Sequence, residues 1–411
     1  MAGKPAGLPS GVRITDRLSL SLLLARFPGE LIDEILSYTG RQSQRQRQLP
    51  AQFMVYYIIA MALYMESSCE EVLRCVVEGL SWLDGWCQKI RNTGRGGISL
   101  ARIRLGVEVM RQLYERCVAP IATTQSRGAW YRGRRLVSLD GTTMDVADTA
   151  DNEATFGRPG SGRGHSGYPQ LRVVCLAETG THVLFGAEVG ACQQGERTLA
   201  RKVVRHLQTG MLCLADRGFF GFALWQQAHQ AGADLLWRVS FQVVLPRLKS
   251  LPDGSYLSKI YPCPQYRQRD VRGVWVRVVD YRLEGLESSQ PAYRLVTTLL
   301  DEAEAPAEEL ASLYQERWEI EGAFDEFKTH LRGGRVVLRS KAPDLVLQEL
   351  YGLLLAHFTI RSLQHEAALK ADLDPDELSF VHTVRVVRRK LPRLLSIPPS
   401  AVAHRLSTNP G

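Results

Sequence analysis

Residues 314–328 read Tyr314-Gln-Glu-Arg317-Trp-Glu-Ile-Glu321-Gly-Ala-Phe-Asp-Glu-Phe-Lys328, a run with helical character that decides how the rest of the chain is interpreted. At about 100° per residue, an α-helix brings four of these side chains within a sector roughly 60° wide: Tyr314, Arg317, Glu321 and Lys328. One helix face therefore carries a carboxylate between two cations. Taken alone, such a carboxylate is more often a solvated surface charge.

Two further acids stand where short apolar runs end. Residues 134–140 close on Asp140 and residues 211–216 close on Asp216, each followed by turn residues, and this pattern predicts strand ends. Strand ends converge on one edge of a sheet. If the helix packs there, the two aspartates and Glu321 can share hard divalent cations, because Mg²⁺ prefers carboxylates and leaves positions for water or phosphate. Three acids on three elements predict a two-metal phosphodiester site.

The order of predicted elements after about residue 125 indicates the fold of this region. We expect strands at 134–140, 171–178, 182–189, 211–215 and 234–240, and helices at 196–208 and 221–231. Three strands followed by alternating helix and strand, with acids on the first and fourth strands, is the order that a ribonuclease-H-like core requires. Because fold alone does not fix function, the acids decide the functional interpretation.

Roughly a hundred residues separate Asp216 from Glu321, more than a helix and its connections need. Residues 243–248 and 274–281 read as short strands, 293–299 as the last core strand and 345–364 as a further apolar helix. Pro306 stands near the start of the helix that carries Glu321, after an acidic segment suited to a helix N-terminus. Asp325, near the Glu321 face, is a reserve metal ligand.

The predicted fold is therefore α/β: a ribonuclease-H-like catalytic core with a β-strand insertion, preceded by an all-α N-terminal DNA-binding domain. Five segments are expected: the N-terminal domain at 1–125, the first part of the core at 126–240, the insertion at 241–292, the second part of the core with the catalytic helix at 293–372, and a basic tail at 373–411.

DNA contacts in the N-terminal domain are expected from Arg102 and Arg104. Ser99 is a natural N-cap, so the two arginines would lie in the first turns of a helix, where recognition helices present side chains to a major groove. An amphipathic core helix with exposed arginines explains the same pattern. The basic residues of 41–47 are equally compatible with a phosphate contact and with a solvated loop. For the basic residues of 385–393, a solvated charged face is slightly favoured over contacts with the DNA backbone or with a second protomer.

The composition favours a polyanionic partner without naming it, because 51 basic side chains exceed 43 acidic ones and the net charge is +8. The eight cysteines form no Cys-x-x-Cys pair and indicate thiols in a reducing compartment. The longest apolar stretch, residues 54–64, is too short to span a membrane and predicts a buried helix. Residues 1–13 lack the apolar region of a secretory signal, so we expect a cytoplasmic protein.

The spacing Tyr-x2-Arg-x3-Glu-x6-Lys resembles the signature of DDE transposases of the bacterial insertion-sequence-four family. Residues 139–143 and 214–220 resemble the two aspartate motifs of that family, and 338–352 resemble the segment after its glutamate. The likeness spans about residues 17–400. It implies that the N-terminal domain helps to hold terminal inverted repeats. The insertion resembles that of hairpin-forming relatives, in which an aromatic side chain stacks on a flipped base. Trp275 and Trp237 are the candidates for this role, although a buried core position is the more common place for a tryptophan.

The expected activity is that of a DNA transposase, which cleaves element ends by hydrolysis and joins the 3′ hydroxyls to target DNA, with a hairpin intermediate as one route. Asp140, Asp216 and Glu321 would hold two Mg²⁺ ions, which Mn²⁺ can replace, and Tyr314, Arg317 and Lys328 would bind phosphates. The partners would be double-stranded DNA and, on that DNA, a second copy of the chain, with no membrane and a nucleoid association in the bacterial cytoplasm.

Three other functions fit part of the pattern. A ribonuclease-H-like nuclease without strand transfer would use the same acids. A catalytically silent DNA-binding protein derived from a transposase would not need them intact. An unrelated two-carboxylate hydrolase would leave Tyr314, Arg317 and Lys328 without a common task.

Overall fold

A computed structural model describes residues 18–45, 48–79, 90, 93–161, 164–282, 293–331 and 337–389. The chain divides into two compact units: unit 1 comprises residues 1–117, 326–364 and 378–411, and unit 2 comprises 118–325 and 365–377. The first division falls at residue 117, where the sequence analysis placed it at 125. The structure also groups 326–364 with the N-terminal helices, whereas the sequence analysis assigned that stretch to the core. The predicted basic cluster from residue 390 onward lies outside the described residues.

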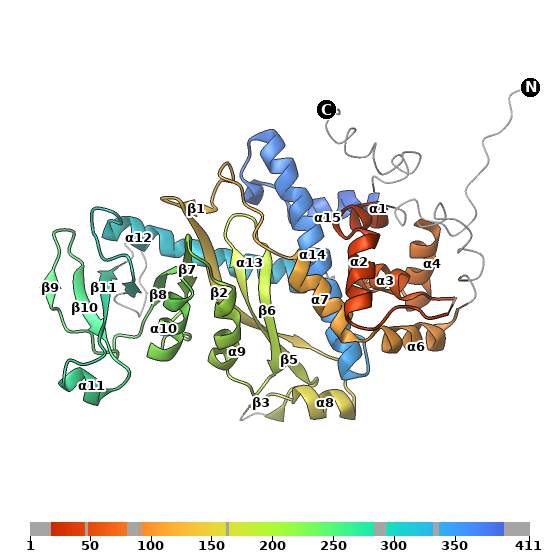
Figure 1. Ribbon diagram of the computed structural model, residues 1–411, viewed down its shortest axis with the longest axis horizontal. Helices are drawn as coiled ribbons and strands as arrows, with labels where there is room; N and C mark the ends of the chain where they lie inside the picture. Colours follow the sequence, from red (N-terminus) through yellow and green to blue (C-terminus); the bar gives the residue numbers. More distant parts are fainter. Residues whose placement is uncertain are drawn as a thin grey trace, which may run out of the picture. The chain divides into compact units, whose positions relative to one another are not determined.

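The regular elements in the described part of unit 1 are all helices (Figure 1). Its elements are α1 (Leu18–Arg26), α2 (Gly29–Tyr38), α3 (Ala51–Leu63), α4 (Cys69–Gly79), α6 (Arg95–Leu105), α7 (Val107–Cys117), most of α14 (Pro343–Ala371) and α15 (Phe380–Arg389). Helix α3 is buried from Phe53 to Leu63, as its apolar sequence predicts. A Cβ at Gly352 of α14 would lie 2.7 Å from the carbonyl oxygen of Ile58, so only glycine permits this close approach of α14 to α3.

No helix in the described ranges combines the length and the apolarity that crossing a membrane requires.

The helix predicted to start at Ser99 starts earlier and is interrupted. Helix α6 begins at Arg95 after the cap residue Gly94, and it ends at Gly106, whose φ of 75° is left-handed. A left-handed glycine terminates a helix because the next residues cannot continue the i to i−4 hydrogen bonds. The prediction that Arg102 and Arg104 lie in the first turns is therefore wrong, and both lie in the last turn of α6.

Unit 2 is built on one mixed sheet, with strand order β6-β5-β2-β7-β8-β12-β11-β10-β9. The core strands are β2 (Arg134–Asp145), β5 (Gln170–Glu178), β6 (Leu184–Ala191), β7 (Met211–Ala215) and β8 (Asp234–Arg238), with the short β1 (Trp130–Tyr131) paired to β2. Strands β2, β5 and β6 are antiparallel neighbours, and β7 and β8 run parallel to β2. This arrangement confirms the predicted ribonuclease-H-like core.

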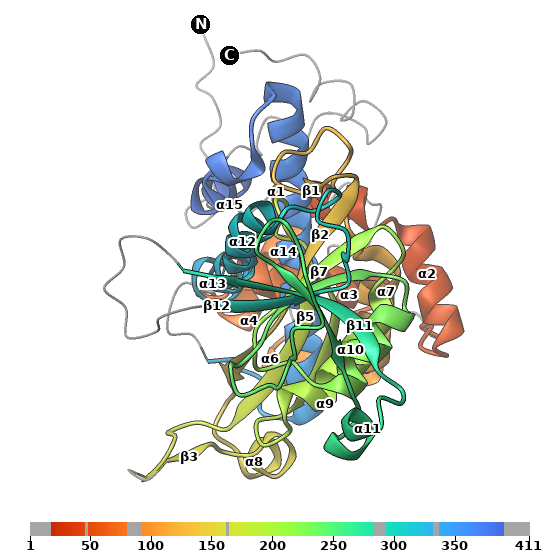
Figure 2. The same cartoon turned by 90° about the vertical axis from the view of Figure 1, so that its left-hand side faces the viewer.

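Helices cover both faces of the sheet (Figure 2). Helices α9 (Glu196–Val203, continued by the short η2, Val204–His206) and α10 (Phe222–Gln230) lie on one side, and α12 (Ala307–Leu313) with α13 (Glu319–Asp325) lies on the other. A buried cluster that includes Leu136, Leu214, Leu236 and Leu310 joins the sheet to α12. Helix α8 (Ala150–Phe156) and the hairpin of β3 (Gly160–Ser161) and β4 (Gly164–His165) follow β2.

The insertion prolongs the core sheet. Strand β12 (Tyr293–Thr297) pairs with β8, β11 (Val274–Tyr281) with β12, β10 (Tyr256–Ile260) with β11, and β9 (Lys249–Ser250) with β10. The predicted strands at 274–281 and 293–299 are confirmed, but residues 243–248 form no strand and α11 (Pro264–Gln268) was not predicted.

The run that carries Glu321 is not a uniform α-helix. Between α12 and α13 lies the 3₁₀ turn η3 (Tyr314–Trp318), and after α13 comes the π-helical turn η4 (Glu326–His330). Irregular turns of this kind within a helix are frequent at functional sites. Pro306 is the cap residue of α12, as predicted.

Candidate active site

Asp140 and Asp216 stand next to each other along two parallel strands. The last matched pair of β2 and β7 is Leu139 with Ala215, and each aspartate is the next residue of its chain segment. Strand β7 ends there, as predicted. Strand β2 does not end at Asp140, because its antiparallel neighbour β5 keeps pairing with it as far as Asp145. Asp140 therefore lies within β2, where β5 pairs with it on one side, while on the other side the pairing with β7 ends at the preceding residue.

Arg317 links the first aspartate to the glutamate of the helix. Its Nη1 lies 3.3 Å from Oδ2 of Asp140 and its Nη2 lies 3.6 Å from Oε1 of Glu321. The Arg317 side chain is 6% exposed, whereas that of Glu321 is 51% exposed. The guanidinium also lies over the ring of Trp318, 4.6 Å from the centroid. A buried cation thus stands between two of the three predicted carboxylates.

The second aspartate has a different set of neighbours. Nη1 of Arg238, the last residue of β8, lies 3.8 Å from Oδ1 of Asp216. The hydroxyl of Tyr314 donates to the carbonyl oxygen of Ala215 at 3.3 Å and is buried, so Tyr314 ties the turn η3 to the end of β7. Sequence reasoning missed Arg238, although its position at the end of the strand beside β7 is a usable signal.

Burial and crowding of acids perturb Asp140. Burial raises the pKa of Asp140 to about 6, and the Gly141 N–H and Arg317 oppose this rise, while the charges of Glu196 and Glu321 add to it. Glu196, the first residue of α9, was not predicted as part of the site. A Cβ at Gly141 would lie 3.1 Å from Oε1 of Glu196, so this fourth carboxylate lies directly beside the Asp140 backbone.

This donor set suits hard divalent cations. Carboxylate oxygens are the preferred ligands of Mg²⁺ and Mn²⁺, and several acids crowded around a buried one are stabilised by added positive charge. Among the described residues, the group whose ligand atoms all lie within 4.8 Å of one another is a different one, formed by His182, Glu319 and Asp376. In the structure as it stands, Arg317 supplies the positive charge between Asp140 and Glu321.

Replacing Asp140 with asparagine is expected to stabilise the metal-free protein at pH 7.5 by about 1–3 kcal/mol. The pKa of folded Asp140 is raised from 3.8 to about 6, so the folded protein loses stability as the pH rises through this window. A neutral asparagine avoids that cost. Thermal denaturation in EDTA should show a higher Tm for the variant at pH 7.5 and no gain at pH 4. A lower Tm at pH 7.5 would show that the Arg317 contact outweighs the cost of burial.

The two arginines predicted to contact DNA have different environments. Arg102 is 5% exposed, and its guanidinium donates to Gln348, Ser340 and the carbonyl oxygen of Leu345, all within unit 1. These contacts give Arg102 a structural role, because a buried guanidinium needs its partners and cannot reach DNA from there. Arg104 is exposed on the same helix.

The remaining predicted side chains lie as follows. Lys328 is half-buried in η4, which belongs to unit 1, and Asp325 is exposed at the end of α13. Trp237 is fully buried in β8, so it is a core residue. Trp275 is 46% exposed on β11, with Nζ of Lys259 4.9 Å from its ring centroid.

A ribonuclease-H-like sheet with acids on its first and fourth strands and a third acid on a covering helix is the framework of enzymes that break and join phosphodiester bonds with metal ions.

The comparisons with known proteins specify the class further. Residues 17–115 match the family described as insertion element 4 transposase N-terminal, and residues 131–359 match the family described as transposase DDE domain. The chain therefore belongs to the DDE transposases of the insertion sequence 4 family, as its Tyr-x2-Arg-x3-Glu-x6-Lys spacing predicts, and it is a DNA transposase. Divalent metal use follows from membership of this family.

The comparisons also match individual proteins. The chain is 29% identical over 380 residues to the transposase InsG for insertion sequence element IS4 of Escherichia coli strain K12, covering 91% of this chain and 83% of that protein. The structure of a piggyBac transposase synaptic complex with hairpin DNA aligns with 95% of this chain and 82% of that one, at a TM-score of 0.47 and 11% identity.

Proposed function

We propose that this transposase hydrolyses phosphodiester bonds at the ends of its insertion sequence at a site formed by Asp140, Asp216 and Glu321. It then joins the liberated 3′ hydroxyls to target DNA. The observation that supports this proposal is the placement of Asp140 and Asp216 at the ends of paired parallel strand segments, with Arg317 contacting both Asp140 and Glu321. The proposed cofactor is a pair of Mg²⁺ ions, for which Mn²⁺ substitutes.

The three carboxylates would hold these ions. When bound, the ions lower the pKa of the attacking water and neutralise charge on the departing 3′ oxygen. Arg317 holds Asp140 and Glu321 in the free protein, and we propose that its guanidinium contacts the phosphate beside the break once ions occupy the carboxylates. Tyr314 fixes the helix against the end of β7 through Ala215. Lys328 is proposed as a further phosphate contact, because a lysine binds phosphate as a point charge.

The partners follow from the reaction. Two element ends must be cut and joined together, so we propose that the chain acts as a homodimer assembled on double-stranded DNA, in the bacterial cytoplasm and associated with the nucleoid. Residues 1–125, with the exposed Arg104, would contact the terminal inverted repeats. If excision proceeds by a hairpin, the exposed Trp275 is the available candidate for stacking on a flipped base, since Trp237 is buried.

Pre-cleaved element ends separate a transposase from a nuclease. Ends that already carry a 3′ hydroxyl bypass hydrolysis, so incubating them with the protein, Mg²⁺ and a circular target should yield joined products. Uncut ends should yield cleavage first and joined products later. Cleavage without any joining of pre-cleaved ends would favour a ribonuclease-H-like nuclease, and neither reaction would favour a DNA-binding protein without catalytic activity.

A further inference from the structure

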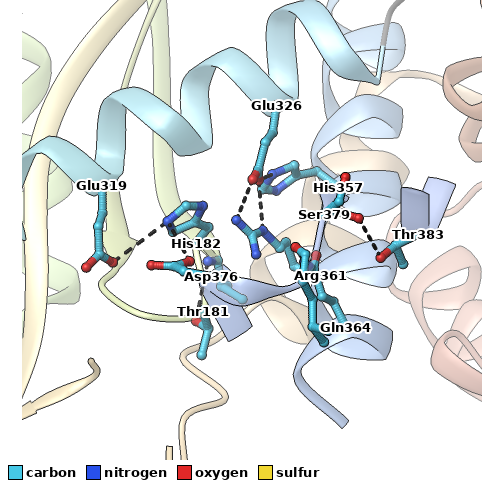
Figure 3. Close-up of polar contacts among 12 residues, drawn as sticks. Thr181, His182, Glu319, Glu326, His357, Arg361, Gln364, Asp376, Ser379 and Thr383 are labelled. Carbon is cyan, nitrogen blue, oxygen red and sulfur yellow. Dashed lines mark hydrogen bonds and ion pairs between the residues drawn. The ribbon is translucent and has the colours of Figure 1, made fainter. Parts of the chain in front are cut away.

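A second cluster of potential metal ligands lies in unit 2, formed by His182, Glu319 and Asp376 (Figure 3). His182 comes from the turn between β5 and β6, Glu319 opens α13, and Asp376 lies in the short helix η5 (Pro375–Glu377). Three segments that are far apart in the sequence thus direct one side chain each to a common point. None of the three belongs to the Asp140, Asp216 and Glu321 site.

The separations between these side chains are close to the ligand–ligand distances of a metal coordination shell. Nε2 of His182 lies 3.3 Å from Oδ1 of Asp376 and 3.7 Å from Oε2 of Glu319. In a tetrahedral zinc site with bonds of about 2.0–2.2 Å, two ligand atoms are about 3.3–3.6 Å apart. The longer separation exceeds a normal hydrogen bond. Because the ligand atoms of all three residues lie within 4.8 Å of one another, they can surround one ion.

The charge and the burial of the three side chains favour the binding of a cation. The Glu319 side chain is 17% exposed and that of His182 is 10% exposed, while Asp376 is the more open member at 38%. The carboxylate of the half-buried Glu319 therefore lies within 4.8 Å of a second carboxylate, that of Asp376, and a proton or a metal ion between such groups offsets their repulsion.

The imidazole of His182 is positioned by a backbone conformation that is unfavourable for this residue type. His182 has a φ of 57°, and this left-handed geometry is unfavourable at a residue other than glycine. Gly180, with a φ of 80°, donates its N–H to Oε2 of Glu319, and a Cβ there would lie 2.7 Å from the carbonyl oxygen of Arg127. The turn is therefore built so that its backbone and His182 both face Glu319.

We propose that His182, Glu319 and Asp376 bind a structural Zn²⁺ ion, with water completing the shell. An imidazole combined with two carboxylates suits zinc, whereas Mg²⁺ takes oxygen ligands and seldom an imidazole. The ion would fasten the β5–β6 turn and the η5 segment to the helix that carries Glu321. The site is separate from the proposed catalytic ions and does not depend on the proposed reaction.

Zinc stoichiometry tests the proposal most directly. The full chain, prepared without a histidine tag and carrying Asp140→Asn and Asp216→Asn to disable the other site, is loaded with Zn²⁺, separated from free metal by gel filtration and analysed by mass spectrometry of the metal. We expect one Zn²⁺ per chain. Adding His182→Asn or Asp376→Asn should remove it, whereas His229→Asn, which alters an exposed histidine of α10, should leave one ion bound.

Thermal denaturation provides a second measurement, which remains informative when a substitution lowers the stability of the protein. Zn²⁺ should raise the Tm of the parent protein above its value in EDTA, and this difference should vanish in Asp376→Asn, which alters the most open ligand and is least prone to misfolding. A parent chain that binds no zinc would overturn the proposal and leave a proton as the compensating charge. Zinc bound equally by the parent and by both ligand variants would also overturn it.

Discussion

The Asp140→Asn variant is expected to lose DNA cleavage by at least about 10³-fold while it still binds element ends. The substitution keeps the size of the side chain but removes the negative charge that would hold a metal ion, and the loss corresponds to about 4 kcal/mol of transition-state stabilisation. DNA binding rests mainly on phosphate contacts by cationic side chains, which the substitution leaves in place. Cleavage of end-containing DNA in Mg²⁺, measured beside a binding titration in Ca²⁺, gives both quantities.

The matched control is Asp145→Asn. Asp145 lies at the far end of the same strand, β2, is half-buried, and accepts a hydrogen bond from Gln170 at 2.7 Å. Its substitution should leave cleavage within about threefold of the parent. Asp216→Asn and Glu321→Gln should behave like Asp140→Asn. Full cleavage by Asp140→Asn and Glu321→Gln together would remove these carboxylates from the mechanism.

The same aspartate links activity to stability. The free protein is expected to be less stable with Asp140 than with asparagine at neutral pH, because the carboxylate is buried beside Glu196 and Glu321. Active sites commonly retain groups that weaken the fold, since the reaction requires them. A variant that gains stability and loses cleavage therefore supports a catalytic role better than one that loses both.

The alternation and spacing of apolar residues predicted most of the strands and helices of the core sheet region. Strands β5 and β7 and helix α10 follow from apolar runs bounded by turn residues, and each was predicted to within one or two residues. Errors arose where tertiary pairing decided the outcome. Strand β2 continues past Asp140 only because β5 pairs with it, and α6 ends at Gly106 because that glycine is left-handed, which the sequence does not show.

The candidate site was predicted in outline and incompletely. Spacing along one helix indicated Arg317 and Glu321, and the strand patterns indicated Asp140 and Asp216. Glu196, beside this site, was missed because it belongs to no spaced motif and reaches Asp140 from the start of another helix. His182, in the separate cluster with Glu319, was missed for the same reason and reaches Glu319 from a left-handed turn. Such contacts depend on packing between segments that are distant in the sequence, and the periodicity of a sequence does not predict them.

Arg317 holds two acids that the proposed reaction would use to bind metal. Its guanidinium is buried and contacts both Asp140 and Glu321, so a divalent ion must compete with it for the same oxygens. The positive charge of Arg317 favours the ionised form of Asp140 against the effect of burial, and its guanidinium bridges Asp140 and Glu321 before ions or DNA arrive. Removal of Arg317 therefore has opposite consequences for metal binding and for catalysis.

The Arg317→Gln variant is expected to bind Mn²⁺ more tightly than the parent at pH 8 and yet to cleave DNA about 10²-fold more slowly. Tighter binding follows because the ion no longer displaces a guanidinium, and slower cleavage follows because the proposed phosphate contact in the transition state is lost. Calorimetric Mn²⁺ titration without DNA and single-turnover cleavage measure the two effects. Arg132→Gln, which removes an exposed arginine bound to Glu309, should change neither. Weaker Mn²⁺ binding would mean that Arg317 chiefly orders the two acids, and unchanged cleavage would exclude the phosphate contact.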